Sequence, residues 1–163
     1  MQKRRGISPV IATVIIVAVT IAVAIAVAFW MTGIVGLFTA AEKLEIVAAN
    51  AAPTAANTWH ITITVRNTGT TTTSIDSIYI NGYLAFPAGD NALTCVANLN
   101  PENLPISLTP GASQDITFNI NGGAACRLGA NGPEVFRPVG GGSIEVKLHT
   151  TGGKEYPKLL VLP

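Results

Sequence analysis

Few residues in this sequence have side chains suited to catalysis or metal binding. There are two histidines, His60 and His149, and two cysteines, Cys95 and Cys126. Neither histidine has a second ligand at metal-binding spacing, and the cysteines lie too far apart for a CxxC metal site. The serines lack the context of a nucleophile elbow, and the acidic residues are scattered. We therefore predict no catalytic residue, no metal site and no cofactor, and expect a protein that is not an enzyme.

Charge and hydropathy divide the chain into two unlike parts. From Ile7 to Ala41 no side chain is charged. All nine acidic residues and seven of the ten basic ones lie between Glu42 and Pro163, a stretch that is also rich in Thr, Asn, Gly and Pro. Because the basic residues form no stripe or cluster there, the sequence excludes nucleic acid as an expected partner.

The apolar part is long enough to cross a membrane as a helix. The run from Val10 to Phe38 spans 29 residues, or roughly 44 Å of helix, whereas the hydrocarbon core of a bilayer is about 30 Å thick. The apolar region of a secretory signal is shorter, at about 7–15 residues. Lys3, Arg4 and Arg5 precede the run and predict a cytoplasmic N-terminus by the positive-inside rule, which places the polar part outside the cell.

The two cysteines both fall in this external part. An even number of cysteines in an oxidising compartment favours a disulfide, here Cys95–Cys126. The bond would close a loop of 32 residues, both cysteines included, which the chain-entropy model values at roughly 3–4 kcal/mol. The alternative is a pair of buried, unpaired thiols.

Two features of the apolar segment predict a helix that packs against other helices. Ser8 and Pro9 form a defined helix start, because serine can cap a free backbone N–H and proline lacks one. Small and β-branched residues then alternate from Val17 to Ala28, so that small side chains form rows at i, i+4 spacing on nearly opposite faces. The rows are Ala18, Ala22 and Ala26, and Thr20, Ala24 and Ala28. A solitary anchor needs neither row, although alanine and valine are also ordinary membrane residues.

The segment RGISPVIA, residues 5–12, leads into this uninterrupted helix and resembles the start of archaeal type IV pilins, which carry a class III signal peptide. The resemblance covers about residues 3–40. It implies that a prepilin peptidase recognises Arg5, Gly6 and Ile7 and cleaves after Gly6, so that Ile7 becomes the N-terminus. Bacterial type IV pilins have a glutamate at the fifth mature position, where this chain has Ile11, and that departure suits the archaeal type.

The resemblance also implies a function. The chain is expected to be a structural subunit of an extracellular type IV-like adhesion pilus, a homopolymer built by the pilus assembly machinery from a membrane-anchored precursor. Its expected parts are a leader (1–6), a hydrophobic helix (7–42) that spans the membrane before assembly and forms the filament core afterwards, and an external domain (43–163). An archaellum subunit and a monomeric, membrane-anchored surface binding module are the alternatives.

Alternation of apolar and polar residues predicts that the external domain is built from strands. Trp59–Arg66 alternates cleanly, as do the segments around Phe118 and Val146. Asn81-Gly82 is a hairpin signal and Pro110-Gly111 a second turn. We expect an all-β, immunoglobulin-like sandwich of about 7–8 strands, and hence an α+β fold with a long N-terminal hydrophobic α-helix.

Two polar features of the external domain allow a structural and a functional interpretation. His60 and His149 lie on the polar faces of predicted strands, where exposed histidines without a metal are the expected interpretation. Thr68–Ser74 is rich in hydroxyl groups. It is expected to be a plain polar turn, and the functional alternative is an O-glycosylated or adhesive outer surface.

Overall fold

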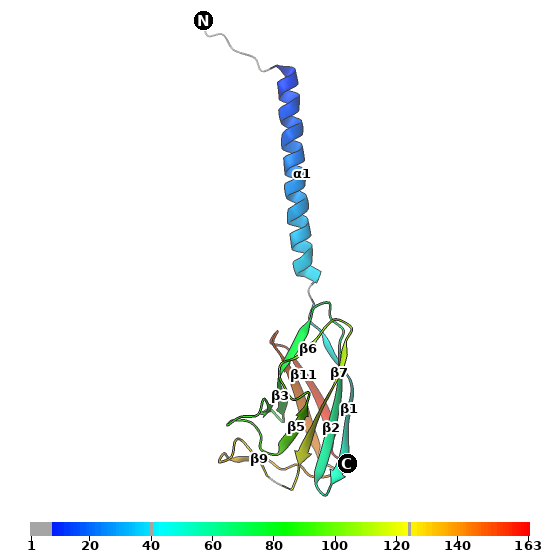
Figure 1. Ribbon diagram of the computed structural model, residues 1–163, viewed down its shortest axis with the longest axis vertical. Coiled ribbons are helices and arrows are strands. Elements are labelled where there is room, and N and C mark those ends of the chain that lie inside the picture. The colour runs from blue at the N-terminus through cyan, green and yellow to red at the C-terminus, as the bar shows by residue number, and fades with distance from the viewer. Residues whose placement is uncertain (1–7, 40, 124) are drawn as a thin grey trace. The chain divides into compact units, whose positions relative to one another are not determined.

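The computed structural model describes residues 8–39, 41–123 and 125–163 (Figure 1). The chain divides into two compact units, Met1–Ala40 and Ala41–Pro163. The first contains the helix α1 (Pro9–Thr39), and the second consists of antiparallel strands, which confirms the predicted α+β class. The predicted leader cleavage site at Arg5, Gly6 and Ile7 lies outside the described residues.

The second unit is the β domain. The strands that the structure describes in it are β1 (Leu44–Ala55), β2 (Thr58–Asn67), β3 (Thr73–Ile80), β4 (Tyr83–Phe86), β5 (Val96–Asn100), β6 (Ile106–Leu108), β7 (Ser113–Asn121), β8 (Cys126–Arg127), β9 (Glu134–Phe136), β10 (Ser143–Thr150) and β11 (Glu155–Val161). Several of the short ones lie in connections between the longer strands. Their presence raises the number of strands above the seven or eight expected from the alternating segments.

The strand order is that of an immunoglobulin-like sandwich. One sheet has the order β1-β2-β7-β5 and the other β11-β10-β3-β4, with β6 pairing with β3 and β8 pairing only with β9. In the immunoglobulin fold one sheet carries strands A, B, E and D and the other carries C, F and G. Here β1, β2, β7 and β5 correspond to A, B, E and D, while β3, β10 and β11 correspond to C, F and G.

The core lies between the two sheets and follows the predicted alternation. Along β2 the side chains of Trp59, Ile61, Ile63 and Val65 are buried, and their neighbours in sequence point outward. The central strands β7 and β10 bury alternate side chains in the same way. The rings of Phe86 (β4) and Phe118 (β7) meet edge to face, with centroids 5.8 Å apart, and so join the two sheets.

Both predicted turns are present. Asn81 and Gly82 connect β3 to β4 with φ values of 51° and 84°, the left-handed pair that a type I′ hairpin turn requires. Pro110 and Gly111 connect β6 to β7, where the Ala112 N–H donates to the Thr109 carbonyl at 3.0 Å and Gly111 has φ of 81°. This is the geometry of a type II turn, in which glycine suits the third position.

Residues 41–43 enter the β domain between two of its loops. The Thr70 N–H donates to the Ala41 carbonyl at 2.8 Å, and the Ala41 N–H donates to the Thr70 hydroxyl at 2.9 Å. The Lys43 carbonyl accepts from the backbone N–H groups of Thr68 and Gly69 at 2.9 and 3.0 Å. On the other loop, the Lys154 ammonium donates to the Glu42 carbonyl at 2.5 Å. These contacts give Thr68 and Thr70 a structural role, in line with the polar-turn interpretation of the hydroxyl-rich segment.

Gly69 permits this entry because it has no side chain. A Cβ added at Gly69 would lie 2.3 Å from the Ala41 carbonyl oxygen and 2.7 Å from the Lys43 nitrogen. We expect Gly69→Ala to displace residues 41–43, to lower the unfolding temperature of the β domain, and to accelerate hydrogen exchange of the Thr68 and Thr70 amides, since hydrogen bonds worth about 1 kcal/mol each would be lost. Thermal unfolding and amide exchange of the detergent-solubilised chain measure both effects. Gly89→Ala is the matched control, because a Cβ there meets nothing within 4 Å; equal behaviour of the two variants would contradict the expectation.

Candidate assembly surface

The surface of α1 is apolar on every side. No residue of this helix is charged, and each one from Pro9 to Val35 is exposed or half-exposed in the single chain. Phe29 and Trp30 are 75% and 68% exposed. The segment Pro9–Val35 is long and apolar enough to cross a membrane. A helix that is hydrophobic all round occurs in a membrane or in the interior of a larger protein structure, so this surface requires a lipid or protein partner.

The helix starts where the sequence predicts a start. Pro9 is the first helical residue, and the Ala12 N–H donates to the Ser8 carbonyl at 3.2 Å as the first intrahelical hydrogen bond. Proline is well placed at this position, because the first backbone N–H groups of a helix have no acceptor within it. The helix then continues through Gly33 and Gly36 to Thr39, so neither glycine interrupts it.

The hydroxyl groups of Thr13, Thr20 and Thr32 on α1 are satisfied within the helix. Thr13 donates to the Val10 carbonyl at 2.8 Å. Thr20 reaches the carbonyls of Ile16 and Val17 at 3.0 and 2.9 Å, and Thr32 likewise reaches the carbonyls three and four residues earlier. Because these donors bond to their own backbone, none of these three threonines presents an unpaired hydroxyl proton to the surface. Burial of these threonines therefore costs little free energy, because no hydroxyl donor loses a hydrogen bond to water.

Large side chains border the predicted small-residue rows and leave shallow grooves between them. One groove is lined by Ala18 together with Thr13, Val14, Val17 and Ile21. A second has Ala28 among Ile25, Phe29 and Thr32. Each groove therefore includes a member of one of the two rows. Small residues at such positions let the backbone of a neighbouring helix approach closely.

The β domain brings together a histidine and an aspartate that are far apart in the sequence. His149 on β10 and Asp76 on β3 meet with 2.6 Å between Nδ1 and Oδ1, and the ring of Tyr79 lies edge-on to the imidazole. His60 is paired with Asn119 across β2 and β7, at 2.7 Å. Both histidines are half-buried rather than exposed, and each has a cross-strand partner. Among the described residues, no three His, Cys, Asp or Glu side chains gather as a metal site.

A second ion pair lies on the same sheet. The Lys147 ammonium (β10) is 2.9 Å from the Glu155 carboxylate (β11). The hydrogen bond from Lys147 to Glu155, reinforced by the attraction between the two charges, raises the pKa of the lysine above its usual value. Because this lysine is solvent-accessible, the pair is a minor source of stability. Together with the His149–Asp76 pair, it makes the outer side of this sheet a polar surface.

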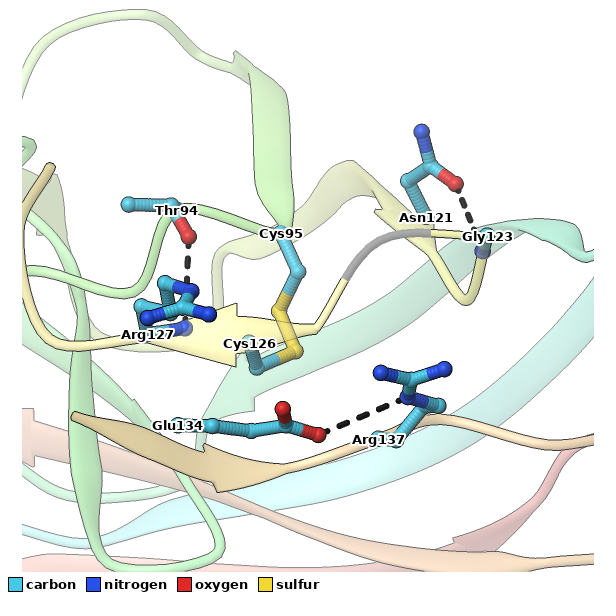
Figure 2. Close-up of a disulfide and its surroundings, with 8 residues drawn as sticks. All are labelled: Thr94, Cys95, Asn121, Gly123, Cys126, Arg127, Glu134 and Arg137. Carbon is cyan, nitrogen blue, oxygen red and sulfur yellow. Dashed lines mark hydrogen bonds and ion pairs between the residues drawn. A yellow bond between two sulfur atoms is a disulfide. The ribbon is translucent and has the colours of Figure 1, made fainter.

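A disulfide connects the two cysteines of the β domain (Figure 2). Cys95, just before β5, is joined to Cys126 at the start of β8. The neighbouring backbones are hydrogen-bonded as well, because the Thr94 N–H donates to the Arg127 carbonyl at 3.0 Å and the Arg127 N–H donates to the Thr94 hydroxyl at 3.2 Å. Both cysteines are buried. The disulfide therefore links the segment that contains β8 and β9 to the sandwich.

Comparisons with known proteins leave the family open. No protein-family model and no curated protein matches the sequence. Among solved structures, the chain is similar to the archaeal flagellum of Methanospirillum hungatei strain JF1, at 17% identity over 94% of this chain and 88% of that one, with a TM-score of 0.46. It is also similar to a β-glucosidase from Erythrobacter marinus, at 19% identity over 74% of this chain but 16% of the glucosidase, with a TM-score of 0.37. At these scores neither likeness identifies a function.

Proposed function

We propose that this chain is a structural subunit of an extracellular filament, a type IV-like adhesion pilus, and that it polymerises through α1. The observation that carries the proposal is an uncharged helix that is apolar on every face and exposed in the single chain. Copies of the same helix, packed side by side, bury this surface along its whole length. Before assembly, the bilayer covers most of it.

The charge pattern around the helix fits this change of environment. Lys3, Arg4 and Arg5 orient the precursor in the membrane with its N-terminus in the cytoplasm. In a filament core the same three charges would be buried among apolar helices, at a cost of several kcal/mol each. Cleavage after Gly6 by a prepilin peptidase removes these three charges and leaves a core segment with no charged side chain from Ile7 to Ala41. The new α-amino group of Ile7 is then the one positive charge at the start of the helix.

The two alternatives differ in use and in assembly. An archaellum subunit would form the same kind of helical core but would serve rotation, and the adhesion assignment rests on the resemblance of RGISPVIA to pilin starts. A monomeric anchored receptor would keep α1 in the bilayer. About a third of the length of the run from Val10 to Phe38 is left over once the hydrocarbon core is spanned, and this excess favours a polymer over an anchor.

Protein recovered from sheared filaments is expected to begin at Ile7. Intact mass spectrometry and N-terminal sequencing measure the loss of residues 1–6. Gly6→Val is expected to retain the leader and to remain in the membrane fraction, because a bulky side chain then stands at the scissile bond, whereas Gln2→Ala is the matched control and is expected to be processed normally. Recovery of the wild-type chain only from membranes, with Met1 intact, would overturn the proposal.

A further inference from the structure

A cavity of about 300 Å³ opens on the β domain between the end of β4 and the connection from β5 to β6. Most of its lining is apolar and comes from Phe86, Pro87, Ala88, Leu99 and Leu104. Two polar residues, Asn98 and Glu102, complete it. A concave, mainly apolar site of this size with a few polar groups is the usual form of a small-ligand site.

Asn98 is placed at the cavity by an irregularity in β5. Its φ is 57°, and the pairing of β5 with β7 shifts register between Ala97 and Asn100, which marks a β-bulge. The other described non-glycine residues with positive φ, Asn57 and Asn81, occupy turns between consecutive strands. No such turn explains Asn98. Bulges of this kind redirect a side chain, and asparagine is one of the few residues other than glycine that adopt the left-handed backbone.

The polar groups of the cavity are free to bind a ligand. Within the described residues, neither the Asn98 amide nor the Glu102 carboxylate has a hydrogen-bond or ion-pair partner, and both residues are exposed. The amide offers two N–H donors and a carbonyl acceptor, and the carboxylate offers acceptors only. Next to them, Leu99 is nearly buried and Leu104 is half-buried, so they provide apolar wall rather than polar contacts.

This combination of groups selects among ligand classes. A divalent cation prefers several oxygen ligands, and the cavity offers one carboxylate. An anionic group is repelled by Glu102. A neutral sugar ring has hydroxyl groups at its edge, which both donate and accept hydrogen bonds, and an apolar C–H face. The hydroxyl groups match Asn98 and Glu102, and the C–H face matches the leucine wall.

We propose that this cavity binds a neutral sugar ring of a surface glycan. The inference rests on the proposed function, since it supplies the attachment contact of the adhesion pilus. One such site is small, and its affinity is expected to be weak. A filament displays the site on every subunit, and simultaneous binding of many copies raises the overall affinity by a factor of about 10²–10⁴ without any new contact.

The test is a binding measurement on the full chain in detergent micelles, with glucose, galactose, mannose and N-acetylglucosamine as separate probes. Chemical-shift mapping is expected to show saturable shifts at Asn98 and Glu102 with at least one sugar. Asn98→Gly, which keeps the left-handed backbone and removes the amide, and Glu102→Ala are each expected to weaken binding at least tenfold. Asn103→Ala is the control, because residue 103 is exposed and does not line the cavity.

A lysine derivative, N-acetyl-lysine methylamide, is a further probe. If it binds at the cavity and no sugar does, the site is one for basic peptides and the inference is wrong. Electron microscopy of cells that carry the same variants separates this result from the proposed function. Normal filaments without sugar binding would overturn the sugar site alone, whereas sugar binding by a chain that never forms filaments would overturn the filament proposal alone.

Discussion

Replacing Ala22 and Ala24 together by leucine is expected to abolish filament assembly and to leave the β domain folded. Ala22 is the middle of one small-residue row on α1 and Ala24 is the middle of the other, so the pair blocks both faces at the same depth of the helix. Overpacking of a close contact typically costs about 1–3 kcal/mol. In a polymer this cost recurs at every subunit, and assembly amplifies it.

The measurement is electron microscopy of cells, together with the distribution of the protein between membranes and sheared filaments. Ile21→Leu combined with Val23→Leu is the matched control, since it changes large side chains of the same helical turn with little change in volume; it is expected to assemble. Either single variant, Ala22→Leu or Ala24→Leu, tests whether both rows are used. Normal filaments from the double alanine variant would show that close helix approach along these rows is not needed.

Most of α1 can be predicted from its local sequence pattern. The alternation of small and β-branched residues in Val17–Ala28 has the period of a strand. The absence of charge over a membrane-length run nevertheless predicts a helix, because a lone strand in lipid would leave its backbone groups unpaired. The structure is helical there, as predicted. The sequence predicts the end of the helix less well than its start. It places the end at residue 42, whereas α1 ends at Thr39 and residues 41–43 are hydrogen-bonded to loops of the β domain.

The long strands of the β domain are also predictable, because their pattern lies in consecutive residues. In β2, β7 and β10, alternate residues are apolar and buried, and each strand is long enough for the period to be visible. β6, β8 and β9 have two or three residues each. A period of two cannot be read from so few residues. β6 exists because it pairs with β3, far away in the sequence, and β8 and β9 pair with each other.

The candidate sites depend on such long-range contacts. His149 and Asp76 lie 73 positions apart and are brought together by the pairing of β10 with β3. The bulge at Asn98, one of the residues that line the cavity, depends on the register between β5 and β7. No local pattern in the sequence marks either feature. The apolar surface of α1 differs because it arises from consecutive residues, and for that reason the sequence predicts it directly.

Removal of the disulfide is expected to have the largest effect on the stability of the β domain. Cys95 and Cys126 are 31 positions apart, and a cross-link over a loop of this length stabilises a folded domain by roughly 3–4 kcal/mol in the chain-entropy model. For a domain of this size, that corresponds to a decrease of roughly 10–15 °C in the unfolding temperature. Cys95→Ala with Cys126→Ala is the suitable variant, because both positions are buried and serine would bury a hydroxyl group there.

Thermal unfolding with and without a reductant separates the cross-link from the packing of the cysteine side chains. The wild-type chain is expected to lose stability on reduction, whereas the double variant is expected to unfold at the same temperature in both conditions. The hydrogen bonds between Thr94 and Arg127 and the bridge between Leu93 and Leu128 remain in the variant, so β8 and β9 are still attached to the sandwich. Hydrogen exchange is nevertheless expected to rise first in β8 and β9, because the covalent link between these strands and the sandwich is lost. If only these strands become mobile and the unfolding temperature stays the same, the disulfide fastens a local excursion and does not stabilise the domain as a whole.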